Sequence, residues 1–372
     1  MSQAPLAGIR VVDFSTLLPG PMCSLMLAQA GAQVVKVERP ERGDEMRSYT
    51  PRFGSESVNF ALLNRSKRSV TLDLKTEAAR DQAISLVREA DVLIEQFRPG
   101  VMDRLGLGYE AMRAINPGLI YCSISGWGQQ GPLANVAAHD LNYQAETGLV
   151  GLAAGSDGTP GLPQALVADI AGGAYPAMMN IMLALRARDS DGLGRHLDVA
   201  MADNLFTLMY WGLGNGWSGA GWPATNDGLV TGGTPRYQIY RTLDGRYLAA
   251  APLEQKFWES FLNVLEAPHL LDDARDPQGT RAAIAAIIAQ RAANEWLQRF
   301  EGKDACVSLV RSLEDAVQQP HFQNRGLFGQ RVEDSQGHAL PALPLPIDAS
   351  LCTTALPTFP ALGEGNDTLL PR

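Results

Sequence analysis

The chain has 372 residues, of which 45% are hydrophobic and 19% are charged. This balance is normal for a folded protein and excludes wholesale disorder, and the length is enough for two cores of ordinary size. Its 40 acidic and 31 basic side chains give a net charge of −9. A general nucleic-acid-binding protein needs a basic face, so we expect no nucleic acid partner.

The four cysteines are dispersed along the chain, at Cys23, Cys122, Cys306 and Cys352. None forms a Cys-x-x-Cys pair, so the sequence predicts neither a metal site nor a disulfide framework, and it fits a reducing compartment. The first residues lack the basic and apolar regions of a signal peptide, and no apolar run is long enough to span a bilayer. We therefore expect a cytoplasmic enzyme without a membrane partner.

Short β-branched runs alternate with helical patterns in the first third of the chain. The runs over 9–14, 34–37, 69–74, 91–95 and 119–124 are predicted strands. Such alternation predicts a Rossmann-like α/β domain, with a mostly parallel sheet covered on both faces and ligands beyond the carboxyl ends of the strands. Neither a Gly-x-Gly-x-x-Gly motif after the first strand nor a P-loop is present, so dinucleotide or ATP binding in the usual way is not supported.

Further along the chain, residues 171–188 predict a long helix, and the Gly- and Trp-rich stretch 211–233 is interpreted as a linker. Beyond it, strand and helix patterns predict a second, smaller α/β domain. A proline-rich tail from Ala339 is expected to pack back on the first domain. The predicted organisation is a large domain made of 1–210 plus 330–372, a linker at 211–233 and a small domain at 234–329.

Two side chains stand out as candidate proton carriers. His139 is one of only five histidines and follows the Gly-rich stretch 125–132, at the expected carboxyl end of a strand. A helix-capping or loop histidine held by Asp140 is an equally good interpretation. Asp169 is a lone carboxylate in an apolar run that leads into a predicted helix. It could be a helix N-cap, or it could act as a base or nucleophile.

Basic residues recur beside the predicted strands. Any one of them is an ordinary solvated surface residue by default, but together at one edge of a sheet they could hold the phosphates of a nucleotide. These residues are Arg39, Arg65, Lys67, Arg68, Arg98 and Arg104.

Seven segments together resemble the family III CoA-transferases, a family that also contains the alpha-methylacyl-CoA racemases. The resemblance runs from about residue 6 to about residue 330, and it is closest to the racemase branch. The segments are Gly8–Asp13, Gly31–Glu38, Leu63–Lys75, Phe97–Gly100, Ser125–Gly128, His139–Tyr143 and Ala168–Gly173.

The resemblance implies an interlaced homodimer whose chains each have a large Rossmann-like domain and a small central domain. It also implies an enzyme that binds CoA as part of its acyl-CoA substrate, with no separate bound cofactor and no metal. The racemases carry a His-Asp-(Ile/Leu)-Asn-Tyr motif and a second acid thirty residues further on, which match His139 and Asp169. The match favours racemisation or epimerisation at the α-carbon of a 2-substituted acyl-CoA.

Two points of the resemblance leave the reaction open. The transferases keep the aspartate as a nucleophile, so a CoA transferase with a covalent intermediate at Asp169 is the alternative. Several racemases have Asn where this chain has Ala165, which weakens the prediction of α-methylacyl substrates. The resemblance also implies that Glu254 of the small domain, contributed by the partner chain, borders the site; a helix-start glutamate is at least as good an interpretation.

The resemblance further implies which residues bind CoA. The adenine nucleotide end would meet Arg39, Arg98 and Arg104, with Asn64, Lys67 and Arg68 nearby. Tyr143 would lie beside the pantetheine arm.

Overall fold

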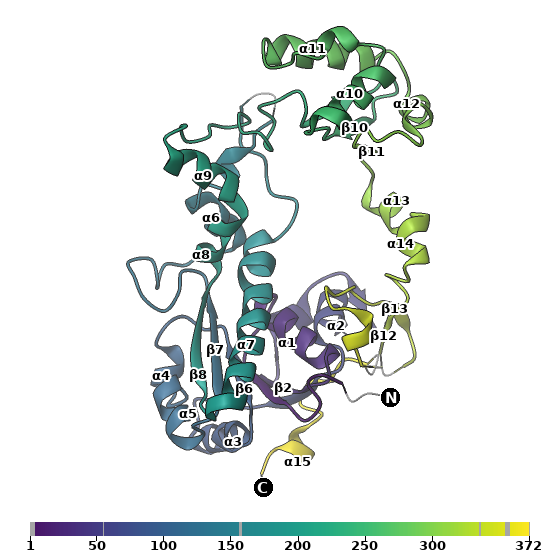
Figure 1. The fold of residues 1–372 in the computed structure, drawn as a ribbon. Helices are drawn as coiled ribbons and strands as arrows, with labels where there is room; N and C mark the ends of the chain where they lie inside the picture. The colour runs from purple at the N-terminus through teal and green to yellow at the C-terminus, as the bar shows by residue number, and fades with distance from the viewer. Residues whose placement is uncertain (1–3, 55, 156–157, 335, 354–357, 372) are drawn as a thin grey trace. The chain divides into compact units, whose positions relative to one another are not determined.

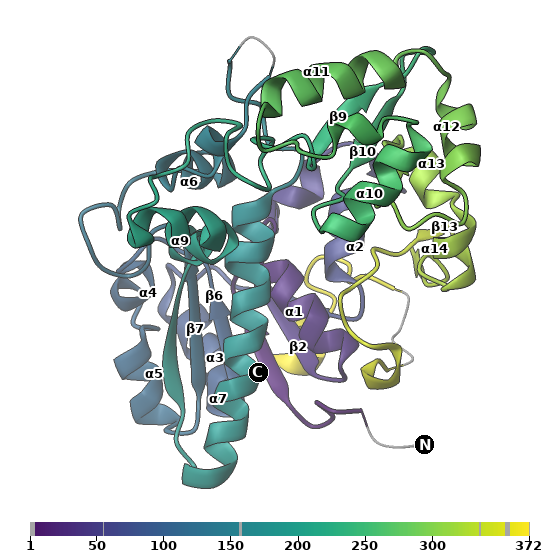
Figure 2. The ribbon, with the colours of Figure 1, turned by 45° about the horizontal axis from the view of Figure 1, so that its top comes forward.

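The computed structural model describes residues 4–54, 56–155, 158–334, 336–353 and 358–371. The chain divides into two compact units, which Figures 1 and 2 show from two directions. The large unit comprises Met1–Thr147, Pro163–Leu208 and Gln323–Arg372, and the small unit comprises Gly148–Leu162 and Met209–Phe322.

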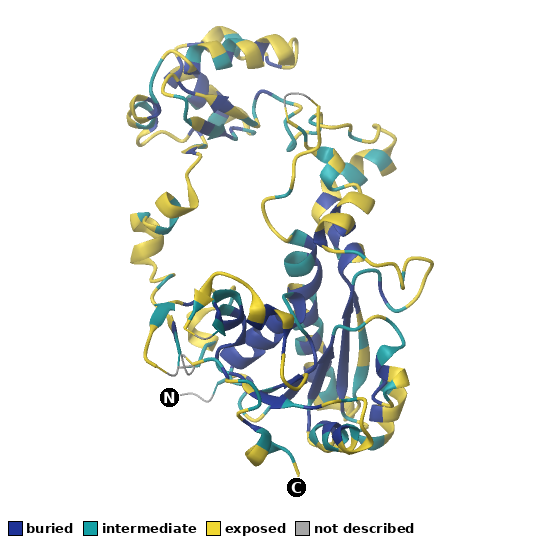
Figure 3. Cartoon of the chain, turned by 180° about the vertical axis from the view of Figure 1, so that it is seen from behind, coloured by how far each residue is buried: buried dark blue, intermediate teal, exposed yellow. Residues whose placement is uncertain are grey.

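A six-stranded parallel sheet is the centre of the large unit. Its strand order is β5-β2-β1-β6-β7-β8, so the chain winds outward from β1 in both directions. Every residue of β6 and β7 is buried, as the dark strands in Figure 3 show, because helices cover both faces there. The strands are β1 (Arg10–Asp13), β2 (Gln33–Glu38), β5 (Arg68–Thr71), β6 (Val92–Glu95), β7 (Ile120–Ser125) and β8 (Arg195–Ala200).

Helices cover the two faces of this sheet. On one face lie α1 (Pro19–Gln29), which is buried along its whole length, and α7 (Tyr175–Asp191). On the other face, α3 (Glu77–Arg88) buries Ala79, Ala83 and Val87, joined by α4 (Val101–Arg104) and α5 (Tyr109–Ile115). The Thr76 side chain caps the start of α3 by accepting the Ala79 N–H. The structure is therefore a mixed α/β fold with a parallel sheet.

The remaining elements of the large unit are short. The C-terminal segment packs on this unit: the Arg65 guanidinium donates to the Leu343 carbonyl, and the Thr353 N–H donates to the Gln29 carbonyl. These elements are β3 (Arg52–Phe53), β4 (Glu56–Ser57), α2 (Val58–Asn64), α6 (Asp140–Glu146), α8 (Met201–Leu205), β12 (Arg331–Glu333), β13 (Ala339–Pro341), α15 (Asn366–Leu369), the 3-10 turns Glu45–Ser48 and Ala349–Leu351, and the π-helical turn Ala168–Ala174.

The small unit has its own core of aromatic and aliphatic side chains. Trp258, Phe261, Trp296 and Phe300 pack against an antiparallel sheet of order β11-β10-β9, with the rings of Phe261 and Phe300 stacked. Its elements are α9 (Tyr210–Ser218), β9 (Gln238–Arg241), β10 (Tyr247–Ala250), α10 (Gln255–Val264), α11 (Pro277–Ile288), α12 (Ala293–Phe300), β11 (Val307–Leu309) and α13 (Leu313–Val317), with 3-10 turns at Val150–Leu152 and Pro268–Leu270; α14 (Pro320–Asn324) and the 3-10 turn Phe206–Met209 lie at the limits of the two units.

The stretch 211–233 was predicted to be a linker, and the structure corrects this in two ways. Most of helix α9 lies within it. Beyond the helix, the Thr225 hydroxyl donates to the Gly151 carbonyl at 2.7 Å, and the Asn226 side chain bonds to both backbone groups of Ala154. The small unit therefore has two segments. The first is 148–162, and the second starts at Met209 rather than at 234.

Candidate functional site

A cavity of about 400 Å³ opens at the carboxyl ends of the parallel strands. It is lined by segments that follow four of them, so it occupies the edge where such sheets bind ligands. The lining consists of Leu17 and Pro19 after β1, Gln96–Pro99 after β6, Ile124–Trp127 at the end of β7, Met201 after β8, and Ala134, Val136–His139, Asn142, Tyr143 and Asp169.

His139 lies immediately before α6, at the N-cap position, and its side chain is exposed at the cavity. Its backbone N–H donates to the Asn142 side-chain oxygen at 3.0 Å, which fixes the first turn of α6. The residue is thus both a helix-start residue and a lining residue of the cavity, so the two interpretations of His139 are compatible.

Asp140 was predicted only as a partner that holds His139, and its carboxylate has a different task. It is buried, and one oxygen accepts the N–H groups of Ala168, at 2.7 Å, and Asp169, at 3.1 Å. The other oxygen accepts from the Gln144 amide at 2.6 Å. Asp140 therefore ties the start of α6 to the turn that carries Asp169, and it is a positioning residue that sequence reasoning missed.

Asp169 is the first acidic residue of the π-helical turn Ala168–Ala174, one position inside it, so it is not an N-cap. A π-helical turn within a longer helix is uncommon and often marks a functional position. The pKa of the Asp169 carboxyl is raised to about 6, chiefly by burial and also by the charge of Asp140, while His139 opposes the shift. A carboxyl with such a pKa can exchange a proton near neutral pH.

Gly172 and Gly173 of the π-helical turn have a packing role. A Cβ at Gly172 would lie 2.4 Å from the Met201 carbonyl oxygen, and one at Gly173 would lie 3.0 Å from the Met201 side chain. The glycines allow α8 to pack closely against the π-helical turn.

Tyr143 forms one wall of the cavity. Its hydroxyl donates to the Ala138 carbonyl at 2.9 Å, and its ring packs edge-to-face on Trp127 with ring centroids 5.0 Å apart. Gly126 must be a glycine there, because a Cβ would lie 2.3 Å from the Tyr143 hydroxyl. Burial raises the pKa of the Tyr143 hydroxyl, so this side chain stays neutral at physiological pH.

Three of the predicted CoA-binding cations lie at the carboxyl edge. Arg98 lines the cavity, and Arg104 follows it on α4, with one guanidinium nitrogen near Gly100. Neither guanidinium has an ion pair with a residue that the structure describes. Arg39 follows β2 at the same edge and pairs with Glu45 at 2.6 Å, with both side chains exposed.

Asn64 and Lys67 are buried rather than at the cavity wall. The Lys67 ammonium donates to the Pro21 carbonyl at 2.9 Å and to the Asn64 side-chain oxygen at 2.8 Å, and it lies 3.6 Å from Asp13. Burial lowers the pKa of Lys67 to about 7. These groups hold the start of α1 in place, and the donors of Lys67 are occupied.

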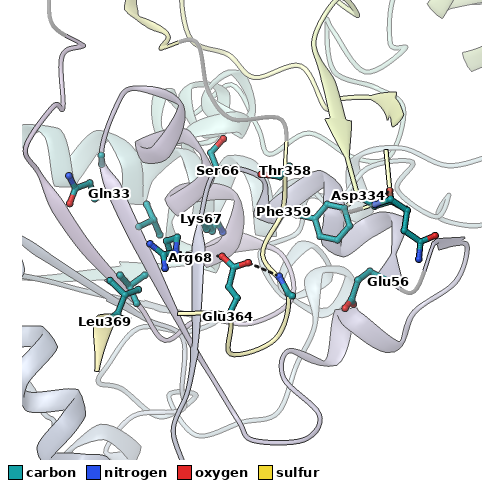
Figure 4. Close-up of a pocket in the computed structure, with 15 residues that line it drawn as sticks. Gln33, Glu56, Ser66, Lys67, Arg68, Asp334, Thr358, Phe359, Glu364 and Leu369 are labelled. Carbon is teal, nitrogen blue, oxygen red and sulfur yellow. Dashed lines mark hydrogen bonds and ion pairs between the residues drawn. The ribbon is translucent and has the colours of Figure 1, made fainter. Parts of the chain in front are cut away.

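Arg68 lies at a second cavity, of about 560 Å³, at the amino ends of β2 and β5 (Figure 4). Its guanidinium donates to the Thr368 hydroxyl at 2.9 Å and lies 3.5 Å from Glu364. Because the strands are parallel, this cavity and the one that holds Asp169 are at opposite edges of the sheet. The structure therefore does not bring Arg68 together with the other predicted site residues.

Glu254 belongs to the small unit, where it immediately precedes α10 and its side chain is exposed. Its backbone carbonyl accepts the N–H groups of Phe257 and Trp258, but its side chain makes no capping hydrogen bond. A role for this carboxylate in the site stays a prediction.

In the part of the chain that the structure describes, no group of three His, Cys, Asp or Glu side chains is arranged to hold a metal ion. None of the described helices has the length and apolarity that crossing a bilayer requires. The carboxyl-edge cavity offers the imidazole of His139, the Asp169 carboxyl with its raised pKa and the Arg98 guanidinium.

The chain belongs to CoA-transferase family III, whose sequence pattern matches residues 6–366. Members of this family are enzymes that act on CoA thioesters. The chain is 35% identical to the human alpha-methylacyl-CoA racemase, over 98% of this chain and 92% of the racemase. It is also 32% identical to the acetyl-CoA:oxalate CoA-transferase of Acetobacter aceti, over 97% of this chain and 94% of that protein.

Solved structures agree with the family assignment. A CAIB/BAIF family protein from Brucella suis superposes with a TM-score of 0.83 at 30% identity, over 99% of both chains. Rv3272 from Mycobacterium tuberculosis, in its orthorhombic form, gives a TM-score of 0.84 at 29% identity, again over 99% of both chains.

Proposed function

We propose that the protein is a racemase or epimerase that inverts the α-carbon of a 2-substituted acyl-CoA thioester. The observation that carries this proposal is that His139 and Asp169 line one cavity at the carboxyl edge of the sheet. Inversion requires one group to remove the α-proton and another to deliver a proton to the opposite face. An imidazole and a carboxyl of raised pKa are suited to both tasks.

The reaction conserves its protons. When the Asp169 carboxylate removes the α-proton, the thioester becomes an enolate and the carboxylate becomes a carboxylic acid. Protonated His139 then donates its proton to the other face of the carbon and is left neutral. The opposite enantiomer reacts by the reverse assignment, with His139 as the base. Each such acid or base contributes about 10²–10⁴-fold to the rate.

The enolate oxygen needs hydrogen-bond donors, and the backbone N–H groups of Asp169 and Ile170 are already in use. The Asp169 N–H donates to Asp140, and the Ile170 N–H donates to the Leu166 carbonyl. Donors for the enolate must therefore come from other groups that line the cavity.

For the CoA portion of the substrate, we propose that Arg98, Arg104 and Arg39 bind the phosphates, and that Tyr143 lies along the pantetheine arm. All three guanidinium groups are exposed, and those of Arg98 and Arg104 have no ion pair with a described residue, whereas Arg39 pairs with Glu45. This supports the proposal, because arginine pairs well with phosphate oxygens. CoA enters as part of the substrate, and we propose no other cofactor and a cytoplasmic location.

The experiment that tests this function is α-proton exchange in heavy water. A branched acyl-CoA, with its single α-hydrogen, is incubated with the enzyme, and deuterium uptake and loss of optical rotation are followed. We expect His139→Ala and Asp169→Ala each to abolish racemisation. The proposal is wrong if Asp169→Ala alone has an effect.

The alternative is a CoA transferase, which the half-buried Asp169 carboxylate and the transferase relatives support. The carboxylate would attack the thioester carbonyl, the C–S bond would break, and CoA thiolate would leave an acyl-aspartyl anhydride. Thiolate attack on the aspartyl carbonyl would then release the first acid and leave an aspartyl-CoA thioester for the acceptor carboxylate. A covalent adduct at Asp169, detected by mass spectrometry with an acceptor present, would favour this reaction over racemisation.

We also propose that the protein is an interlaced homodimer in which Glu254 of the partner subunit completes the site. Support comes from α7, where Tyr175, Met179 and Leu183 repeat every four residues on one helix face. They are 40%, 58% and 62% exposed, which is unusual for large apolar side chains in a row. Light scattering of the purified protein tests the dimer, and a monomer at micromolar concentration would contradict it.

A further inference from the structure

A row of polar side chains crosses three strands directly behind the carboxyl-edge cavity. Glu95 of β6, Ser123 of β7 and Asp198 of β8 are register partners, so their side chains stand side by side on one face of the sheet. Glu95 is only 4% exposed, and Ser123 is buried as well. The two carboxylates of this row accept hydrogen bonds from N–H groups in the loops that follow β6 and β7.

Glu95 is bonded to the loop that carries Arg98. Its carboxylate accepts the Phe97 N–H at 2.8 Å, directly before Arg98. The same loop is held a second time, because the Gln96 side-chain oxygen accepts the Gly20 N–H at 3.0 Å. The 96–100 loop is therefore tied both to β6 and to the start of α1, and Arg98 has a fixed backbone.

Asp198 holds the loop after β7 by accepting a backbone hydrogen bond, as Glu95 does for the loop after β6. Both of its carboxylate oxygens lie within hydrogen-bond distance of the Gln129 N–H, at 3.0 and 3.2 Å. This N–H follows Gly128, whose φ of 81° is readily adopted only by glycine. The 126–132 loop so fixed carries Trp127, which packs on Tyr143 and donates to the Val136 carbonyl.

Ser123 joins the Glu95 carboxylate to a histidine. A carboxylate can only accept, so the Ser123 hydroxyl donates to Glu95 and accepts from the His196 ring nitrogen, 2.9 Å away. The His196 ring stacks on Tyr109, which holds this end of the chain of hydrogen bonds in place.

We propose that Glu95 and Asp198 are positioning residues for acyl-CoA binding, each fixing one of the two loops that wall the cavity. Neither lines the cavity, so they act through Arg98 and Trp127 rather than on the substrate. The inference rests on the proposed function, because it takes the occupant of the cavity to be a CoA thioester.

The environment of Glu95 adds a pH dependence to this arrangement. Burial raises the pKa of the Glu95 carboxyl to about 7, the hydrogen bonds from Ser123 and Phe97 oppose the shift, and the charges of Asp103 and Asp198 add to it. The other titratable groups that face it are Tyr121 of β7 and, through Ser123, His196 of β8. An ionised carboxylate is the stronger acceptor for the Phe97 N–H, so the loop is held best above neutral pH.

The experiment measures the dissociation constant of free CoA together with amide hydrogen exchange of the two loops. We expect Glu95→Ala to raise the dissociation constant about tenfold and to speed exchange in the 96–100 loop. Asp198→Ala should weaken binding about threefold and speed exchange in the 126–132 loop, because its carboxylate is exposed and its hydrogen bonds are longer. Glu89→Ala, which removes an exposed carboxylate paired with Arg10, is the control and should change neither.

Glu95→Gln separates positioning from a merely structural role. In this variant the side-chain amide oxygen accepts the Phe97 N–H at every pH. The variant should therefore bind CoA at pH 8 as the wild type does. The affinity of the wild type for CoA should improve between pH 6 and pH 8, and that of the variant should not. The phosphates of CoA titrate equally with both proteins, so a difference between the two profiles belongs to Glu95.

Wild-type binding and exchange in Glu95→Ala would overturn the inference, as would parallel pH profiles for the wild type and Glu95→Gln. If Glu95→Ala does not fold, the CoA affinity and loop exchange of Glu95→Gln and Asp198→Ala test the inference instead. If the wild type itself does not bind CoA, the proposed function fails and the binding role of Glu95 fails with it. Binding by the wild type without racemisation or transfer would remove the proposed chemistry alone.

Discussion

The large unit has a cavity at each edge of its sheet, and the two differ in what their charged groups do. At the carboxyl edge, Arg98 has no charge partner among the described residues and Asp169 has a raised pKa. At the amino edge, Arg68 lies 3.5 Å from Glu364, and Figure 4 labels both side chains. Arg68 also donates to the Thr368 hydroxyl, and Asp334 pairs with His338 at 2.7 Å. The amino-edge cavity is the larger of the two, so volume does not distinguish them. Charges left without partners are the better sign of a place prepared for a ligand.

The strongest way to break this comparison is to remove one carboxylate from each cavity. Asp169→Asn keeps the shape of the side chain but not its charge or proton affinity, so we expect racemisation or transfer to fall by about 10³-fold. Asp334→Asn at the amino edge should leave the rate within about twofold of the wild type. Equal losses in the two variants, measured at saturating acyl-CoA, would mean that the cavities do not differ as described.

The buried ammonium of Lys67 can be compared with an exposed lysine on the surface. Replacing Lys67 by Met removes one of the two buried ammonium groups, those of Lys67 and Lys36, whose charges stabilise the Asp13 carboxylate, and we expect a loss of about 3–5 kcal/mol in the free energy of unfolding. Lys75→Met, on the exposed surface, is the matched control and should change it by less than about 0.5 kcal/mol. Urea denaturation measures both. A stable Lys67→Met protein that has lost only CoA affinity would instead make Lys67 a ligand-binding residue.

The two arginines give a direct comparison of the edges in ligand binding. Arg98→Ala removes a guanidinium with no partner in the described chain, so the dissociation constant for CoA should rise at least about tenfold. Arg68→Ala removes one that is already paired and should change it less than about twofold. Isothermal titration with CoA decides, and a larger effect at Arg68 would reassign the nucleotide site to the amino-edge cavity.

The smallest expected effect concerns the pH at which Asp169 ionises. The charge of Asp140 helps to raise the pKa of Asp169, so Asp140→Asn should lower that pKa. The side-chain oxygen of Asn can still accept the N–H groups of Ala168 and Asp169. Asp169 then stays ionised at lower pH. The fall of kcat on the acidic side of its pH profile, expected near pH 6 in the wild type, therefore moves to lower pH. A limb that does not move would mean that another group controls it.

The central strands could be predicted because burial on both faces leaves a plain apolar signal. β6 and β7 lie within one or two residues of the predicted ranges 91–95 and 119–124. The edge strand β8 was missed, because Arg195 and His196 are consecutive and Asp198 follows after one apolar residue, a polar pattern that is typical of a loop.

For the site, the sequence predicted residues that the structure brings to one cavity at the carboxyl edge, but it did not predict how they are held, and their roles stay predictions. His139, Asp169, Arg98 and Tyr143 line one cavity. Whether a lysine beside a strand points outward or inward depends on neighbours that are distant in sequence, and this is why the burial of Lys67 could not be foreseen.

The positioning carboxylates Asp140 and Glu95 could not be predicted from the sequence either. Asp140 bonds to backbone groups 28 and 29 residues further along, a contact that no local pattern encodes. Glu95 bonds to a group only two residues away, yet what sets it apart is burial against two neighbouring strands. A charged residue at the end of an otherwise apolar strand run is the signal that could have drawn attention to Glu95.

The route of the chain through the large unit bears on how the protein is made. All six sheet strands are complete by residue 200, but the segment from Gln323 joins the same unit only after the small unit has been synthesised. During synthesis, β5 therefore lies at the outer edge of the sheet before Asn366 has been made. Only after that can the Asn366 side-chain oxygen accept the Thr71 N–H. Nascent chains that stall before this last segment emerges would present an open strand edge, which is the kind of surface that chaperones protect.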